Sequence, residues 1–141
     1  MTRTGSCFCG AVQFVASEIG KLGACHCTSC QRWTGGPLLG VSVPEGALVV
    51  TGSEHVVTRR TSGWATRSNC GTCGSPLWYR YDKGVDGTGS YEVPLGLFDE
   101  KDDIPLTSEI FIDFKPAGFA FAGNHPRRTR AEIMPASPEG A

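Results

Sequence analysis

The segment Cys70-Gly71-Thr72-Cys73-Gly74 is a C-x-x-C motif with one glycine inside the cysteine pair and another directly after it. Such a segment forms a knuckle, because glycine lets backbone N–H groups turn toward the thiolates without a Cβ clash. This third cluster follows a first cluster, Cys7-Phe8-Cys9, and a middle cluster, Cys25-His26-Cys27-Thr28-Ser29-Cys30. Zinc, with Zn–S bonds of about 2.3 Å, draws sulfurs close together and requires such short spacings. The three clusters therefore predict metal sites that organise the fold.

The chain has seven cysteines, and all of them lie in these three clusters. Seven thiolates divide into one closed four-sulfur site and one three-sulfur site whose fourth position is open to a substrate. The alternative is a disulfide framework. It would leave one thiol unpaired, C-x-C geometry is awkward for a bridge, and the opening Met-Thr-Arg-Thr-Gly is not an apolar signal segment. We therefore expect metal binding in a cytoplasmic protein, where thiols stay reduced.

The composition predicts a mainly β protein. The 141 residues are 40% hydrophobic, which suits one domain with a core, and the 19 glycines and nine prolines indicate many turns and short strands. A net charge of −1 gives no basic field for nucleic acid or an anionic membrane, and no apolar run approaches the ~20 residues that cross a bilayer. We expect a domain at 1–125 and a poorly ordered, solvated tail at 126–141. Strands are predicted at 38–43 and 76–81.

Two local predictions bear on the site. Residues 28–34 are expected to form one or two helical turns with Thr28 as the N-cap, stopped by the glycines and proline that follow. Residues 47–51 and 55–60 flank Gly52-Ser53 and are expected to form a hairpin.

Loop closure favours one division of the cysteines into sites. A metal that closes a loop removes entropy from the unfolded chain, and the loop between the first and third clusters is the longest one available. Joining part of the middle cluster to the third is the alternative, and spacing alone leaves it open. The favoured ligands are Cys7, Cys9, Cys70 and Cys73 for a structural zinc, and Cys25, Cys27 and Cys30 for an open zinc site.

The three histidines are weaker candidates for metal ligands than the cysteines. Neighbouring residues of a strand point to opposite faces, so if Cys25 and Cys27 share one face, His26 takes the other. We expect His26 to be exposed or hydrogen-bonded rather than bound to metal. His55 and His125 stand alone and are expected to be surface or packed histidines.

The charge of an open site limits its chemistry. Three thiolates around Zn²⁺ leave a net charge of −1, which makes a poor Lewis acid for producing hydroxide at neutral pH. Such a site is suited to one more soft ligand, such as a thiol that loses its proton on binding. A thiolate held there can attack, or be released from, a small carbonyl carbon.

Three motifs, in this order, resemble the glutathione-dependent formaldehyde-activating enzyme (GFA) family. They are Cys7-Phe8-Cys9-Gly10-Ala11-Val12, Cys25-His26-Cys27-Thr28-Ser29-Cys30-Gln31-Arg32, and Cys70-Gly71-Thr72-Cys73-Gly74-Ser75-Pro76-Leu77. The likeness runs from Gly5 to about Pro116. It implies an Mss4-like fold, in which small coiled β-sheets surround zinc.

The resemblance also implies roles for the clusters. The first and third clusters hold a structural zinc, and the middle cluster holds the zinc to which glutathione binds while its S-hydroxymethyl adduct forms. Cys25, Cys27 and Cys30 are then the catalytic residues of a carbon–sulfur lyase that resembles an S-hydroxymethylglutathione synthase. Its partners are a glutathione-type thiol and formaldehyde or another small aldehyde. Family members often carry histidine where this chain has Glu109.

Arg32 lies beside the middle cluster and can pair with a carboxylate of a glutathione-like ligand, although the same pattern fits a surface arginine on a short helix. Two other functions use the same cysteines. One is a zinc-stabilised binding module without catalysis, and the other is redox or formaldehyde sensing by the middle cluster.

Overall fold

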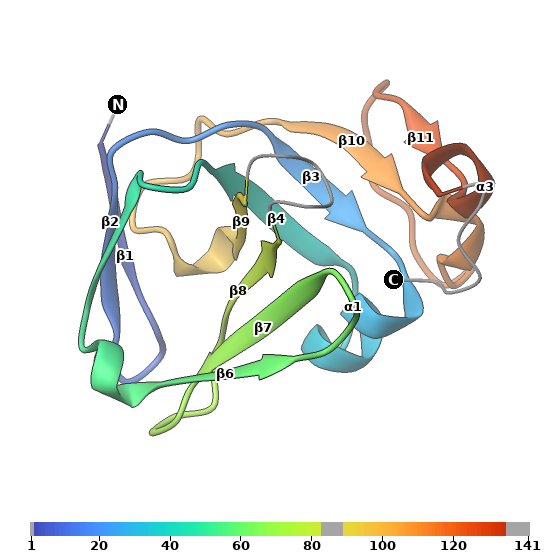
Figure 1. The fold of residues 1–141 in the computed structure, drawn as a ribbon. Helices are drawn as coiled ribbons and strands as arrows, with labels where there is room; N and C mark the ends of the chain where they lie inside the picture. Colours follow the sequence, from blue (N-terminus) through green and yellow to red (C-terminus); the bar gives the residue numbers. More distant parts are fainter. Residues whose placement is uncertain (1, 83–88, 135–141) are drawn as a thin grey trace. The chain divides into compact units, whose positions relative to one another are not determined.

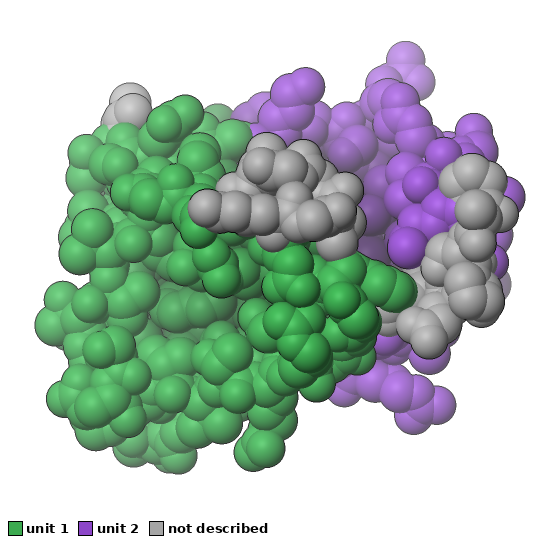
Figure 2. Space-filling model, in the orientation of Figure 1, with its two compact units in different colours: residues 1–20, 41–103 green, residues 21–40, 104–141 purple. Residues whose placement is uncertain are grey.

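The computed structural model describes residues 2–82 and 89–134 and is built mainly from short strands, as the composition predicts (Figure 1). The chain divides into two compact units (Figure 2). The first unit contains residues 1–20 and 41–103, and the second contains residues 21–40 and 104–141. Strand β4, Leu38–Val43, matches its predicted bounds and carries the chain from the second unit to the first.

The first unit holds a three-stranded antiparallel sheet in the order β1-β2-β5. Its strands are Arg3–Ser6, Gln13–Ala16 and Leu48–Thr51. Exposed and buried residues alternate along β2, so its inward face packs on the core. There, the ring of Phe14 meets that of Phe98 edge to face, with centroids 5.2 Å apart.

The same unit holds an antiparallel run of four strands, in which β6 pairs with β7, β7 with β8, and β8 with β9. The strands are Val56–Arg60, Ala65–Cys70, Pro76–Tyr81 and Tyr91–Pro94. Strand β8 has its predicted bounds. The β7–β8 connection is the third cysteine cluster, so strand pairing closes the knuckle at both ends.

The predicted hairpin at 47–60 is wrong. Strand β5 pairs with β2, and strand β6 pairs with β7. A short 3-10 helix, η1, Ser53–His55, separates the two strands. Gly52 precedes it with a φ of 82° and a ψ of 29°. The chain leaves β5 through a left-handed residue and a helical turn, so the two strands do not fold back on each other.

Two contacts close the first unit around β1. Gly5 forms a bridge with Phe98, just after the 3-10 helix η2, Leu95–Leu97. The buried guanidinium of Arg3 makes a two-pronged ion pair with Asp103, with both N–O distances at 2.8 Å.

The second unit contains parallel strands. Strand β10, Leu106–Ile110, pairs with β3, Leu22–Cys25, on one side and with β11, Arg127–Arg128, on the other. Glu109 stands opposite Ala24 and Arg127, and Ile110 stands opposite Cys25. The end of β10 is therefore level with the start of the middle cysteine cluster.

Helix α1, Thr28–Thr34, has the predicted bounds and ends at Gly35, whose φ is 83°. Its N-cap is Cys27 rather than the predicted Thr28. Cys27 has extended backbone angles, and its sulfur accepts the N–H of Cys30 at 3.3 Å, so a thiol does what the Thr28 hydroxyl was expected to do.

The expected tail carries secondary structure where it is described. Strand β11 is followed by helix α3, Arg130–Ile133, which begins with a capping box between Thr129 and Glu132. The N–H of Glu109 donates to the carbonyl of Pro126 at 3.0 Å and ties this segment to β10. Residues 135–141 of the tail lie outside the described residues. Among the described helices, none is long and apolar enough to cross a membrane.

Candidate metal centres

The first and third clusters meet in the first unit and form a four-cysteine group. One sulfur from each of Cys7, Cys9, Cys70 and Cys73 lies within 4.8 Å of the others. The Cys7–Cys9 and Cys9–Cys70 sulfur distances are 3.7 and 3.9 Å. Four sulfurs around a tetrahedral zinc stand about 3.8 Å apart, given Zn–S bonds of about 2.3 Å. The predicted pairing of these clusters is confirmed, and the sulfur geometry fits a metal ion.

The knuckle directs backbone donors at its sulfurs. The N–H of Cys73 points to the sulfur of Cys70 at 3.4 Å, and the N–H of Gly74 donates to the carbonyl of Cys70 at 2.8 Å. Gly74 has a φ of 82°, which a residue with a Cβ adopts only with strain. Donors of this kind stabilise thiolates, the form that binds metal.

Two cysteines of the four-cysteine group, Cys73 and Cys9, differ in their pKa values. The hydroxyl of Ser75, 3.2 Å from the sulfur of Cys73, and the backbone N–H of Ser75 lower the pKa of Cys73 to about 5. The backbone N–H of Ala11 favours the Cys9 thiolate, but burial and the neighbouring thiols raise the pKa of Cys9 to about 11. Four sulfurs this close cannot all be anionic without a cation, which a metal ion supplies.

The middle cluster forms a three-cysteine group in the second unit. Cys25 ends β3, Cys27 caps α1, and Cys30 lies in the first turn of the helix. Their sulfurs all lie within 4.8 Å of one another, and among the described residues no histidine or acidic ligand atom joins them. Hydrogen bonds with the thiols of Cys27 and Cys30, together with burial, raise the pKa of Cys25 strongly. The group offers a metal three sulfurs and leaves a fourth position.

We expected His26 to be either exposed or hydrogen-bonded, and the structure shows that it is hydrogen-bonded. Its side chain is fully buried, and Nε2 lies 2.7 Å from Oε1 of Glu109. Its Nδ1 is buried without a partner among the described residues. An unpaired buried nitrogen costs about 1–3 kcal/mol.

Sequence reasoning missed the cluster around Glu109. Its Oε2 accepts bonds from Nε2 of His125 at 2.6 Å and from Nε of Arg127 at 2.9 Å. His125 was expected to be a lone surface or packed histidine, and Arg127 a solvated arginine. The one signal in the sequence was a charged residue directly before Ile110-Phe111.

Burial alone would raise the pKa of Glu109. Hydrogen bonds from His125 and His26, and the charge of Arg127, outweigh it and hold the pKa of Glu109 below its usual value. The carboxylate is therefore ionised at neutral pH, although only 1% of it is exposed.

Arg32 lies in the last turn of α1 and is exposed. It follows Cys30 by two positions, about 200° around an α-helix, so the two side chains leave the helix on different sides. No described residue pairs with its guanidinium. A ligand of the three-cysteine group would have to extend past the helix edge to meet it.

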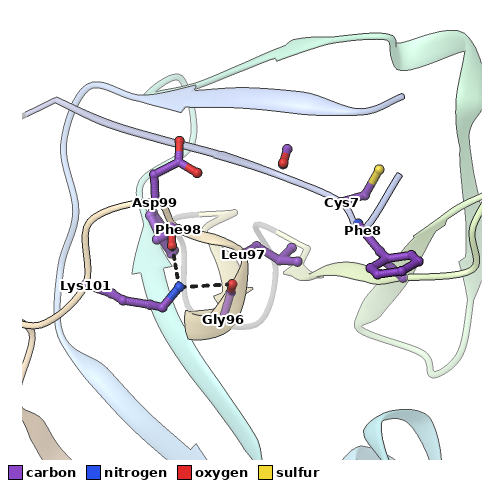
Figure 3. A pocket seen from close by; sticks show the side chains of 9 residues that line it. Cys7, Phe8, Gly96, Leu97, Phe98, Asp99 and Lys101 are labelled. Carbon is purple, nitrogen blue, oxygen red and sulfur yellow. Dashed lines mark hydrogen bonds between the residues drawn. The ribbon is translucent and has the colours of Figure 1, made fainter. Parts of the chain in front are cut away.

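A hollow of about 470 Å³ lies next to the four-cysteine group (Figure 3). The ring of Phe8 forms part of its wall and is 92% exposed. On another side, the ammonium of Lys101 donates to the carbonyls of Phe98 at 2.8 Å and Gly96 at 3.4 Å. The Asp99 carboxylate also lines the hollow.

The model of one protein family, the glutathione-dependent formaldehyde-activating enzymes, matches residues 2–113. This range contains both cysteine groups. The chain belongs to the GFA family. An uncharacterized lyase of Schizosaccharomyces pombe is 30% identical to it over 131 residues, which are 92% of this chain and 93% of the relative.

One further comparison concerns the family, and another concerns the fold alone. A Halomonas elongata protein, whose provisional name contains the words glutathione-dependent formaldehyde-activating enzyme, is 33% identical over 87 residues, 55% of either chain. A crystal structure of a Rhodobacter sphaeroides protein superposes with a TM-score of 0.59 at 20% identity, covering 88% of this GFA-family chain and 98% of that one. The predicted mainly β, Mss4-like fold class is confirmed.

Proposed function

We propose that this GFA-family protein is a zinc-dependent carbon–sulfur lyase. Its substrate is the adduct of a glutathione-type thiol with formaldehyde or another small aldehyde. The observation that carries the proposal is the three-cysteine group, whose sulfurs converge with no fourth ligand among the described residues. Three thiolates around Zn²⁺ disfavour hydroxide chemistry and favour a further soft ligand. Family membership and the lyase name of the S. pombe relative support the same reaction class.

The two cysteine groups have different tasks in this proposal. The four-cysteine group holds a structural zinc, and the three-cysteine group holds the reactive one. Zinc bound there supplies a soft Lewis acid at which a thiol binds with loss of its proton. Cys27 caps α1 and Cys30 lies in its first turn, with their sulfur–amide bond at 3.3 Å, so the helix start keeps two of the three ligands in place.

The reaction is balanced without an oxidant or a reductant. In the adduct-forming direction, the thiol sulfur attacks the aldehyde carbon and a C–S bond forms. The carbonyl oxygen takes the electron pair of its π bond together with the proton that the thiol lost. Cleavage is the reverse, and returns thiol and aldehyde.

Arg32 is proposed to pair with a carboxylate of the thiol substrate. Its exposed guanidinium has a fork that matches a carboxylate. We expect Arg32→Ala to raise the KM for glutathione, with kcat and metal content unchanged. If the KM of this variant equals that of the parent, Arg32 is a surface residue of α1.

The test of the proposed function compares the parent with Cys27→Ser. Calorimetry with glutathione should detect binding to the parent and none to the variant. NMR of glutathione and formaldehyde should detect catalysed exchange with the S-hydroxymethyl adduct only in the parent. Equal binding by both proteins would show that the three-cysteine group does not hold the thiol.

We also propose that residues 1–125 act as one GFA-type domain, followed by the segment 126–141, and that the protein works in the cytoplasm. A reducing compartment keeps all seven cysteines, which are free thiols here, available to metal.

A binding module is the second candidate function, and Phe8 favours it. In this second proposal, the ring of Phe8, which is 92% exposed beside the hollow and between two predicted zinc ligands, is the aromatic anchor that a partner would cover. Phe8→Ala would then abolish partner capture and leave thiol binding intact. If the protein is a GFA-type lyase that binds no partner, this substitution should not change its function.

A further inference from the structure

The carboxylate of Glu109 connects three segments of the second unit. Its Oε1 is 2.7 Å from His26, and its Oε2 is bonded by His125 at 2.6 Å and by Arg127 at 2.9 Å. His26 lies 83 residues away in the sequence, inside the middle cluster. Glu109 itself precedes Ile110, the residue opposite Cys25. The bonds therefore converge on the backbone that carries the three-cysteine group.

His26 is held at every polar group of its backbone. Its N–H donates to the carbonyl of Ile110 at 3.1 Å, and its carbonyl accepts from Nε2 of Gln31 at 2.7 Å. The bond to Glu109 fixes the side chain as well. Since His26 separates Cys25 from Cys27, these contacts hold the backbone between the two cysteines.

Three features of this region each cost folding free energy. The Glu109 carboxylate is ionised and buried. His26 Nδ1 is buried and, among the described residues, has no partner. Phe111 is buried with a φ of 56° and a ψ of 41°, a left-handed conformation that residues with a Cβ rarely adopt. Local departures of this kind are typical of functional sites, where geometry matters more than stability.

We propose that Glu109 is a positioning residue for the three-cysteine group. Through His26 it holds the backbone between Cys25 and Cys27 in the conformation at which the three sulfurs converge. The proposal rests on the proposed function, because it assigns a metal to that group.

Through Arg127, the Glu109 carboxylate also holds the segment 119–127, whose two phenylalanine rings pack on His26. The rings of Phe119 and Phe121 each lie 6.0 Å from the His26 ring. Arg127, bonded to Glu109, also donates to the carbonyls of Phe121 at 2.9 Å and Gly123 at 3.1 Å. Loss of the carboxylate would free both the imidazole and the segment that packs on it.

The test is a cobalt titration of the parent and of Glu109→Gln from the metal-free state, with circular dichroism to follow the folding of the first unit as its four-cysteine site fills. Cobalt reports thiolate ligands by absorption, and the parent is expected to show two sites. In E109Q the four-cysteine site should fill as in the parent. The affinity of the three-cysteine site should fall about 10- to 100-fold, the usual effect of removing a group that orients a metal ligand. Unchanged affinity and spectrum at that site would overturn the proposal.

Asp103→Asn is the matched control, because it removes the carboxylate of another ion pair with a buried partner, Arg3, in the first unit. It should leave the three-cysteine site unchanged. If Glu109 only stabilised the fold, E109Q and D103N would change the cobalt affinities of the two sites in the same way.

A double-mutant cycle with His26→Asn tests whether Glu109 acts on the three-cysteine group through His26. If Glu109 acts through His26, the E109Q/H26N protein loses no more affinity than either single variant. Additive losses would show that Glu109 does not act through this contact. If E109Q does not fold, Arg127→Gln replaces it, since this change removes one of three donors. It should weaken the three-cysteine site partially, and no effect would count against the proposal.

Hydrogen exchange separates the proposal from the proposed function. If the parent binds cobalt at one site only, the metal assigned to the three-cysteine group is wrong. The amides of His26 and Gln31, bonded to Ile110 and Cys27, should nevertheless exchange faster in E109Q than in the parent, with the amide of Gly74 unchanged. Equal exchange at His26 and Gln31 would overturn the positioning role independently.

Discussion

Gly52 lies directly against the backbone of Ala11, so close that a Cβ at position 52 would overlap the carbonyl oxygen of Ala11. The φ of Gly52 is 82°, so a side chain there would also strain the backbone. Gly52→Ala should therefore combine two costs: about 1–2 kcal/mol for the left-handed conformation and about 1–3 kcal/mol for the clash. The measurement is the denaturation midpoint with zinc held constant.

Gly46 provides the control for this prediction. Its φ is 89°, but a Cβ there would meet nothing within 4 Å. Gly46→Ala should show the conformational cost alone. Equal losses in the two variants would mean that the approach of Gly52 to Ala11 does not constrain the fold.

Cys73→Ser should unfold much of the first unit. Apparent zinc-binding free energies of about 10–16 kcal/mol in small sites exceed the stability of an average domain, about 5–15 kcal/mol. Cys27→Ser should instead give a folded protein that has lost one metal, because its site closes only a short loop. Circular dichroism and metal analysis of the two variants test this contrast, and a Cys73→Ser protein that melts like the parent would contradict it.

The Arg3–Asp103 ion pair should make stability depend on pH. The hydrogen bond from Arg3 holds the pKa of Asp103 below its ordinary value of 3.8. A carboxylate with a lowered folded-state pKa stabilises the fold above its unfolded pKa, and this contribution is lost as the pH falls through the lower, folded value. The stability difference between the parent and Asp103→Asn should be constant above about pH 5 and shrink below pH 4.

Melting temperatures of both proteins, measured from pH 7 to pH 3, provide the test. Effects of metal release are shared by the two proteins and cancel in the difference. A difference that does not change with pH would show that the ion pair does not contribute through its charge.

Phe8 and Phe14 should respond differently to truncation. Phe8 is almost fully exposed, so Phe8→Ala should change stability by no more than about 0.5 kcal/mol. Phe14 is buried against Phe98 and Trp78, so Phe14→Ala should cost about 3–5 kcal/mol. Denaturant unfolding of both variants checks this, and a large loss in Phe8→Ala would mean that its ring packs against the protein.

Short-range patterns accounted for much of the candidate site. The C-x-C and C-x-x-C spacings bring sulfurs together over two or three residues, and loop closure then selected the pairing of Cys7 with Cys70. Gly35 ends α1 where the sequence predicts, because only a left-handed residue closes that turn without strain. Such features depend on a few neighbouring residues, so they can be predicted from the sequence without knowledge of the fold.

The partners of Glu109 and of β5 were decided by the tertiary structure alone. The sequence predicted a hairpin at Gly52 because both flanking segments favour strands, but strand propensity does not specify the partner strand. Likewise, nothing local relates Glu109 to His26 or Arg127. The parallel register of β3, β10 and β11 makes them neighbours, and long-range pairing of this kind follows from packing the whole chain. By itself, the sequence determined which cysteines form each cluster, since their spacing is local; the structure decided which clusters meet and what surrounds and orients them, since those contacts span the chain.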